Sequence, residues 1–216
     1  GVATEDDESL RARILEKIAG PAENGNRQHY KTWCESVAGV GRAWVKPLWN
    51  GENTVMGVLI SPEGLPVSDS VIKDVQQYID PNDLGLTAIV DGKTYVVGDG
   101  CGNGRANIGA HFTAISAEAL TVNVAFQAEL ASGRASNDLK TAVEDAITEY
   151  LQNLVLTAKE DDVLIVRLNA IGAILTTLSD YLVDYRDLTL NGKTENIRAK
   201  DTEVPVLGEV SISVIP

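Results

Sequence analysis

The sequence has few of the residues that build most chemical sites. Its 216 residues include only two cysteines, two histidines and one methionine, and aromatic residues make up 5%. Lys and Arg number 18 against 31 Asp and Glu, for a net charge of -13. Binding a phosphate backbone requires clustered Lys and Arg, so we expect no nucleic-acid partner. The same balance disfavours an anionic membrane surface. No run of about 18 apolar residues occurs, so we expect no membrane insertion.

The cysteines and histidines form no recognisable site. Cys34 and Cys101 lie far apart, and with no signal peptide ahead of them free thiols in a reducing cytosol are the simplest interpretation. A thiolate–imidazole pair could join Cys101 to His111 or Cys34 to His29, but neither stands in a nucleophile motif. A zinc site would need all four residues, without the usual short spacings. We therefore expect no catalytic residue and no metal ligand.

Glycine is concentrated in the stretch 98–104, which reads GDGCGNG. A loop that cradles phosphate must lead from a strand into a helix N-terminus, and here another strand is expected after Arg105. We therefore expect no nucleotide and no other cofactor. A mobile contact loop in an assembly is the better interpretation, with Gly100, Cys101, Asn103 and Arg105 as interface candidates.

Turn residues divide the rest of the chain into expected elements. Apolar residues at every fourth position predict a first helix that ends at Gly20-Pro21. Asp91-Gly92 predicts a hairpin over 87–97. Further helices are expected over 24–40, 68–79, 136–154 and 163–178. Further strands are expected over 42–47, 54–60, 108–115, 121–130, 181–190 and 204–214, and Pro205 suits a sheet edge.

The aromatic residues near the N-terminus could fill a core or anchor an interface. Trp33 and Trp44 are expected in the core, and both roles stay open for Trp49. Tyr30 and Trp49 are kept as interface candidates.

The order of these elements predicts an α+β fold with three parts. These are an N-terminal helical arm over 1–38, a first α/β domain with a hairpin insertion over 39–118, and a second α/β domain over 119–216. A strand-opening threonine and a helix-capping serine are 14 residues apart at Thr54 and Ser68, and 15 apart at Thr121 and Ser136. The spacing suggests a duplicated strand–turn–helix unit.

Several short motifs recur in an order that resembles a known family. They are Leu10-Arg11-Ala12-Arg13 after an acidic run, Gly25-Asn26 with Tyr30 and Trp33, Val37-Ala38-Gly39-Val40, Val45-Lys46-Pro47 ahead of Gly51-Glu52-Asn53-Thr54-Val55, Ile108-Gly109-Ala110-His111 and Leu190-Asn191-Gly192. This order is similar to that of the baseplate J-like family of contractile phage tails, including those of Mu-like phages and Bacillus prophages.

The resemblance implies a structural subunit of the tail baseplate of a phage, prophage or tailocin. Such a subunit acts through interfaces with other baseplate proteins and with copies of itself in the wedge or ring. It implies no enzymatic activity and no small-molecule substrate, a place in the virion tail baseplate, and assembly in the host cytoplasm. Family members have a shorter link where the 87–97 hairpin stands, so the hairpin is an elaboration. They also carry a further N-terminal region, and the start at Gly1 without a methionine indicates a piece of a longer chain.

Two other functions stay open. A cell-wall-directed hydrolase would need a cleft with converging carboxylates, or a Cys–His pair of perturbed pKa. A saccharide-binding module of a tail would need a preformed pocket with exposed aromatic residues.

Overall fold

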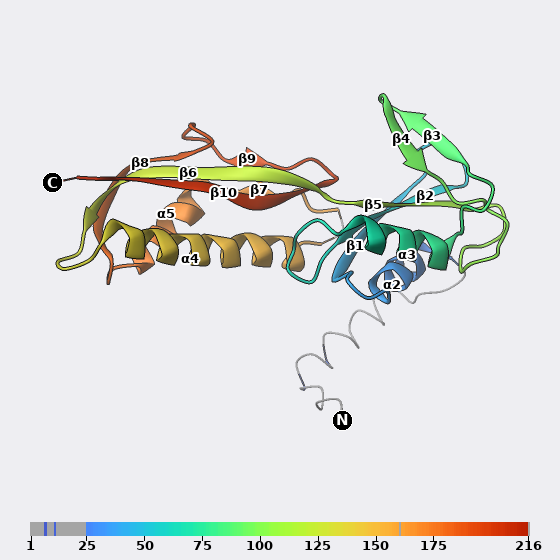
Figure 1. Cartoon of the computed structure of the whole chain (residues 1–216), viewed down its shortest axis with the longest axis horizontal. Coiled ribbons are helices and arrows are strands. Elements are labelled where there is room, and N and C mark those ends of the chain that lie inside the picture. The colour runs from blue at the N-terminus through green and yellow to red at the C-terminus, as the bar shows by residue number, and fades with distance from the viewer. Residues whose placement is uncertain (1–6, 8–10, 12–24, 160, 216) are drawn as a thin grey trace. The chain divides into compact units, whose positions relative to one another are not determined.

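The computed structural model describes Asp7, Arg11 and residues 25–159 and 161–215 (Figure 1). The fold is mixed α+β, as the sequence predicted. It divides into two compact units, Gly1–Ser61 with Val67–Ser116, and Pro62–Pro66 with Ala117–Pro216. The three-part division expected from the sequence, with a separate arm over 1–38, stays a prediction. The helix expected before Gly20 lies outside the described residues except for Asp7 and Arg11, which are helical.

The first unit is built on a three-stranded sheet with the order β1-β2-β5. Central strand β2 pairs antiparallel with β1 and parallel with β5. A two-stranded hairpin, β3-β4, is inserted between α3 and β5. The elements are α2 (Arg27–Glu35), β1 (Arg42–Pro47), β2 (Thr54–Ile60), α3 (Asp69–Ile79), β3 (Thr87–Val90), β4 (Lys93–Val96) and β5 (His111–Ser116).

The core of the first unit is organised around an aromatic stack. The Tyr30 ring of α2 lies parallel to that of Phe112 in β5, with centroids 5.6 Å apart, and Trp33 meets Tyr30 edge-on at 5.1 Å. Gly57 lies beneath this stack on β2, and a Cβ there would stand 2.7 Å from Phe112 Cζ and 3.1 Å from Cys34 Sγ. Glycine is therefore required at position 57 so that α2 and β5 can pack closely over the central strand.

The second unit packs two helices on one face of a sheet with the order β10-β6-β8. Figure 1 shows α4 running along this sheet. Alternate residues of β6 from Val122 to Ala128 are buried, as are those at every fourth position of α4 from Leu139 to Val155. The elements are β6 (Glu118–Leu130), α4 (Ser136–Thr157), β7 (Ile165–Val166), α5 (Leu168–Thr177), β8 (Leu182–Leu190), β9 (Ile197–Arg198) and β10 (Glu203–Val214).

Two asparagines hold the three strands of the second sheet together. The Asn191 side chain accepts a hydrogen bond from Asn123 N (2.8 Å) and donates one to Thr121 O (3.0 Å). Asn123 Oδ1 in turn accepts from Glu209 N (2.8 Å), where the β10 ladder is irregular between Leu207 and Val210. The asparagine of the Leu-Asn-Gly motif thus joins the end of β8 to β6 through side-chain hydrogen bonds.

Several sequence predictions are confirmed in detail. Strands β1 and β2 have the expected bounds. Asp91 and Gly92 have φ of 52° and 77°, which suits the expected tight hairpin turn. Trp44 is buried, and Trp33 packs against the core from a half-buried position. Pro205 lies in the edge strand β10. The duplication stays a prediction, because the antiparallel neighbour precedes β2 in the first unit and follows β6 in the second.

Three element predictions were wrong in their bounds. The helix expected over 24–40 spans only Arg27–Glu35. The helix expected over 163–178 begins only at Leu168, because residues 165–166 pair with β9 as strand β7. Apolar runs of this length do not distinguish strand from helix. The strand expected from 108 begins at His111, since Ala110 N closes a turn onto Asn107 O (3.0 Å).

We expect Gly57→Ala to lower the free energy of unfolding by about 1–3 kcal/mol, because the added methyl group overlaps the Phe112 ring. Urea unfolding followed by tryptophan fluorescence measures the change. The matched test is Gly57→Ala combined with Phe112→Leu, which removes the obstructing ring atoms. The alanine should then cost less than it does alone. An equal cost in both backgrounds would show that the ring is not the obstacle.

Candidate interaction surface

The glycine-rich loop of the first unit is fastened to the fold at both ends. It leads from β4 to β5, and Gly98 N donates to Phe112 O (2.8 Å). Arg105 N and Ala106 N both donate to Ile79 O at the end of α3 (2.8 Å each). Between these anchors, residues 101–103 are exposed, whereas Asp99 and Gly100 are buried.

Asp80 is the main internal anchor of the loop. Its side chain is buried, and its carboxylate accepts hydrogen bonds from Phe112 N (2.9 Å) and Gly100 N (3.1 Å). A Cβ at Gly98 would overlap this carboxylate, so the close approach requires glycine. Burial raises the pKa of Asp80. The two backbone donors and His111 oppose this rise in pKa, and nearby Asp99 adds to it.

Asp99 and Gln76 complete the attachment. Asp99 accepts from Asp83 N (2.8 Å) and Leu84 N (3.1 Å), which fixes the segment that leads into the hairpin. Gln76 donates to Phe112 O (3.0 Å) and accepts from Ala114 N (2.9 Å). The sequence analysis missed these three residues, because a buried amide or carboxylate has no local motif. The one available signal was the Asp99 that interrupts the glycine run.

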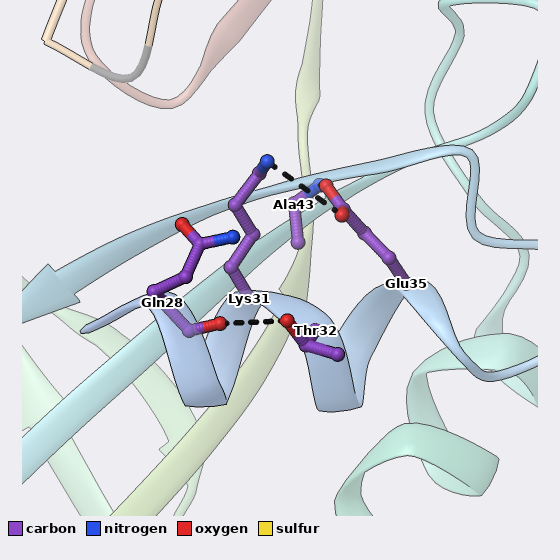
Figure 2. Close-up of polar contacts among 5 residues, drawn as sticks. All are labelled: Gln28, Lys31, Thr32, Glu35 and Ala43. Atoms are coloured by element: carbon purple, nitrogen blue, oxygen red, sulfur yellow. Dashed lines mark hydrogen bonds and ion pairs between the residues drawn. The ribbon is translucent and has the colours of Figure 1, made fainter. Parts of the chain in front are cut away.

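A similar contact covers the other edge of the sheet, at β1 (Figure 2). The Glu35 carboxylate at the end of α2 accepts a hydrogen bond from Ala43 N (3.1 Å) and lies 3.7 Å from Lys31 Nζ. Thr32 Oγ1 donates to Gln28 O within the helix (2.9 Å). Asn26 caps the same helix by accepting from His29 N (2.8 Å). The Gly-Asn motif therefore sets the start of α2, and Glu35 fixes its end on β1.

The structure brings four of the six interface candidates together in the loop. Cys101, Asn103 and Arg105 are exposed, whereas Gly100 is buried beneath them. The Arg105 guanidinium lies 5.2 Å from the centre of the Tyr78 ring. The two aromatic candidates lie elsewhere. Tyr30 is only 2% exposed in the core stack, where burial and the charge of Asp80 raise its pKa to about 12. Trp49 is half-buried against Tyr95 of the hairpin (5.0 Å).

The structure does not assemble the Cys–His pairs into nucleophiles. The Cys101 thiol faces Asp99 O (3.8 Å), and the His111 ring is hydrogen bonded to Gly98 O (2.8 Å). Cys34 is fully buried and its pKa is raised by that burial, while the His29 ring lies tilted against the Trp33 ring. Among the described residues no cluster of three or more His, Cys, Asp or Glu could hold a metal ion. Nor does any helix of the described residues have the length and apolarity to cross a membrane.

Exposed apolar side chains are a second feature that the sequence analysis missed. Ile89 and Val96 of the hairpin are 74% and 51% exposed, and Ile108 in the loop is 85% exposed. Leu48, in the turn between β1 and β2, is 66% exposed at a φ of 58°. Such a backbone is strained for leucine, so the turn holds this side chain outward at a cost. The first unit therefore exposes apolar side chains on its hairpin, its glycine-rich loop and the turn between β1 and β2.

Asp80→Ala should lower the free energy of unfolding by about 2–4 kcal/mol, because the buried N–H groups of Phe112 and Gly100 lose their acceptor. Urea unfolding monitors the change. Asp83→Ala is the control, since the Asp83 side chain is exposed three residues away. If the two variants unfolded at the same urea concentration, the carboxylate would not be an anchor.

The pH dependence of stability should follow from the raised pKa of Asp80. The ordinary pKa of an aspartate, which applies to the unfolded chain, is about 3.9. Because the pKa of Asp80 is higher in the folded protein, protonation of Asp80 favours the folded state. The stabilisation that protonated Asp80 gives is complete at pH values below its pKa in the unfolded chain. It is lost as the pH rises through its pKa in the folded protein. The wild type should therefore gain stability relative to Asp80→Asn as pH falls from 7 towards 4. Paired urea titrations test this, and a relative loss of stability in acid would mean that the backbone donors outweigh the cost of burial.

Comparison with known proteins agrees with the two-unit division. Residues 22–116 match the family model of the baseplate J-like central domain, and residues 122–213 match that of the baseplate J-like C-terminal domain. The first match ends at residue 116 and the second begins at residue 122, and the two structural units divide after Ser116.

Two proteins of Bacillus subtilis (strain 168) are similar over nearly the whole chain. They are the phage-like element PBSX protein XkdT and the protein YqbT, each 34% identical over 212 residues. The match covers 98% of this chain and 55% of each relative, so the chain spans about half of their length.

One solved structure shares the fold. It is a chain in the cryo-EM structure of the anti-feeding prophage baseplate, with a TM-score of 0.55 and 10% identity over 95% of this chain and 42% of that chain. The fold, the order of the two matched domains and the similarity to XkdT agree, and the chain belongs to the baseplate J-like family.

Proposed function

We propose that the chain is a structural subunit of the baseplate of a contractile tail, where it works through protein–protein interfaces in the wedge or ring. The observation that carries this proposal is the succession of the two baseplate J-like domains along the chain. The PBSX relative, named as part of a phage-like element, supports it, as does the fold shared with a chain of the anti-feeding prophage baseplate.

The surface of the first unit suits such a role. Cys101, Asn103 and Arg105 project from a loop whose base is fixed by Asp80 and Asp99, so an interface there would lose little conformational entropy on binding. We infer that this loop, together with Trp49 and the exposed apolar residues, contacts other baseplate proteins and copies of the chain. Tyr30 is not part of this surface, because its ring lies in the core.

The proposed mechanism requires no bond chemistry, no cofactor and no small-molecule substrate. A net charge of -13 disfavours a nucleic-acid or anionic membrane partner and favours basic patches on neighbouring proteins. A groove of about 620 Å³ lies along α3. Among the described residues its walls contain Asp69, Lys73 and Val96 but no aromatic side chain, which does not suit saccharide stacking. We place the protein in the tail baseplate, with assembly in the host cytoplasm.

Mass spectrometry of tail particles purified from the source bacterium tests the role directly. Peptides of this chain should co-sediment with the sheath and tube proteins at a ratio that fits a ring, and should be missing from particles without baseplates. A chain that stays soluble beside intact tails would overturn the proposal.

The same assay tests the loop. Arg105→Glu should reduce incorporation into tails about tenfold or more, as expected when a central interface arginine is lost. Arg134→Glu is a matched control, since Arg134 is also exposed and lies 4.7 Å from a tyrosine ring, that of Tyr181. Equal incorporation of the two variants would remove the loop from the interface and leave the baseplate role intact.

A further inference from the structure

The β3-β4 hairpin has an uncovered strand edge. It forms a two-stranded sheet, and no other strand in the described part of the chain pairs with it. Figure 1 shows it projecting from the first unit. Val97 N donates to Leu86 O (3.1 Å), which fixes the alternation along β3. Ala88 and Val90 therefore direct their backbone groups to β4, while Thr87 and Ile89 direct theirs outward.

The composition of this edge is unlike that of a protected strand. Residues 84–90, with the sequence LGLTAIV, contain no charge and no proline. Natural edge strands are guarded against pairing by lysine, proline or inward-pointing charges, and this one has none of these. Ile89 and Leu84 are 74% and 67% exposed beside it. An edge with this composition is suited to pair with another strand.

We propose that β3 pairs antiparallel with β3 of a second copy of the chain, about a two-fold axis at Ala88. In this register Thr87 of each copy lies opposite Ile89 of the other, so the outward N–H and C=O groups of both residues form four hydrogen bonds. Ala88 faces its own counterpart in the closely spaced, non-hydrogen-bonded position, where a small side chain fits best.

The ends of the strand exclude the neighbouring registers. An axis at Thr87 would place Ile89 opposite Gly85, and an axis at Ile89 would place Thr87 opposite Asp91. Gly85 and Asp91 have φ of 70° and 52°, so neither continues the extended ladder. Only the axis at Ala88 keeps all paired residues within β3.

The chemistry of β3 favours an identical partner. Like charges opposite one another destabilise a strand pair, and a strand without charge brings none to its two-fold axis. Thr87 and Ile89 would form two cross-strand pairs of β-branched side chains, which are favourable. The contact is short, so we expect a weak dimer that repeated contacts within a ring would reinforce. This inference deepens the self-association within the proposed function and relies on that function only for the setting.

Disulfide trapping in the full chain tests the register. Ala88→Cys is placed in a Cys101→Ser background, because Cys101 is exposed and Cys34 is buried. Cα atoms in the non-hydrogen-bonded pair are about 4.5 Å apart, within the range that a disulfide can bridge. Ile89→Cys in the same background is the matched control, because its counterpart would lie about 8 Å away, beyond that range.

Under mild oxidation with diamide, the variant with cysteine at position 88 should form linked dimers about tenfold faster or more than the one at position 89. Adding Ile89→Lys to the Ala88→Cys variant should remove the advantage, and circular dichroism should show an unchanged fold, since Ile89 is exposed. Equal rates at 88 and 89, or no effect of the lysine, would overturn the pairing. Neither result bears on whether the chain is found in tails, so the proposed function is judged separately.

Discussion

Every strand at the edge of a sheet must find partners for its outward backbone groups, and the first unit depends on how it meets this requirement. At one edge of the β1-β2-β5 sheet, Glu35 accepts from Ala43 N. At the other, Gln76 and Asp80 bind the backbone of Phe112 and Ala114. Side chains of α2, of α3 and of Asp80 just after α3 thus take some of the hydrogen bonds that neighbouring strands would otherwise make.

Related contacts attach the hairpin segment between α3 and β5 to the rest of the first unit. The Asp80 carboxylate is shared between Phe112 N of β5 and Gly100 N of the loop, and Asp99 binds the segment that enters the hairpin. The hairpin segment and the loop are therefore bound by side chains at the same edge of the sheet. The cost is a buried carboxylate with a raised pKa, and two backbone donors partly offset that cost.

The sequence predicted those features whose causes are local. Asp91-Gly92 specifies a tight turn through its own backbone preferences, and the bounds of β1 and β2 follow from the turns that flank them. The anchors could not be predicted, because Asp80 is 20 and 32 residues from its two donors. From the sequence Asp80 ends a helix, and nothing local shows that its carboxylate is buried. The family was predicted from the order of short motifs. The structural roles of these motifs, such as the hydrogen bonds from the Asn191 side chain to β6, could be seen only in the folded structure.

The edges of the β1-β2-β5 sheet bind side chains, whereas strand β3 of the hairpin has a free edge in the described part of the chain. This difference separates features expected throughout the family from those expected only in members with the hairpin. The three-stranded sheet, with side-chain contacts at both edges, belongs to the matched central domain. The hairpin is expected to be an elaboration, and among the described residues no strand other than β4 pairs with its strand β3. Pairing through β3 would then belong to members that carry the hairpin and not to the family as a whole. Because the uncharged strand could pair with many others, such members would need a partner in place soon after folding, and a second copy of the same chain is the partner always present.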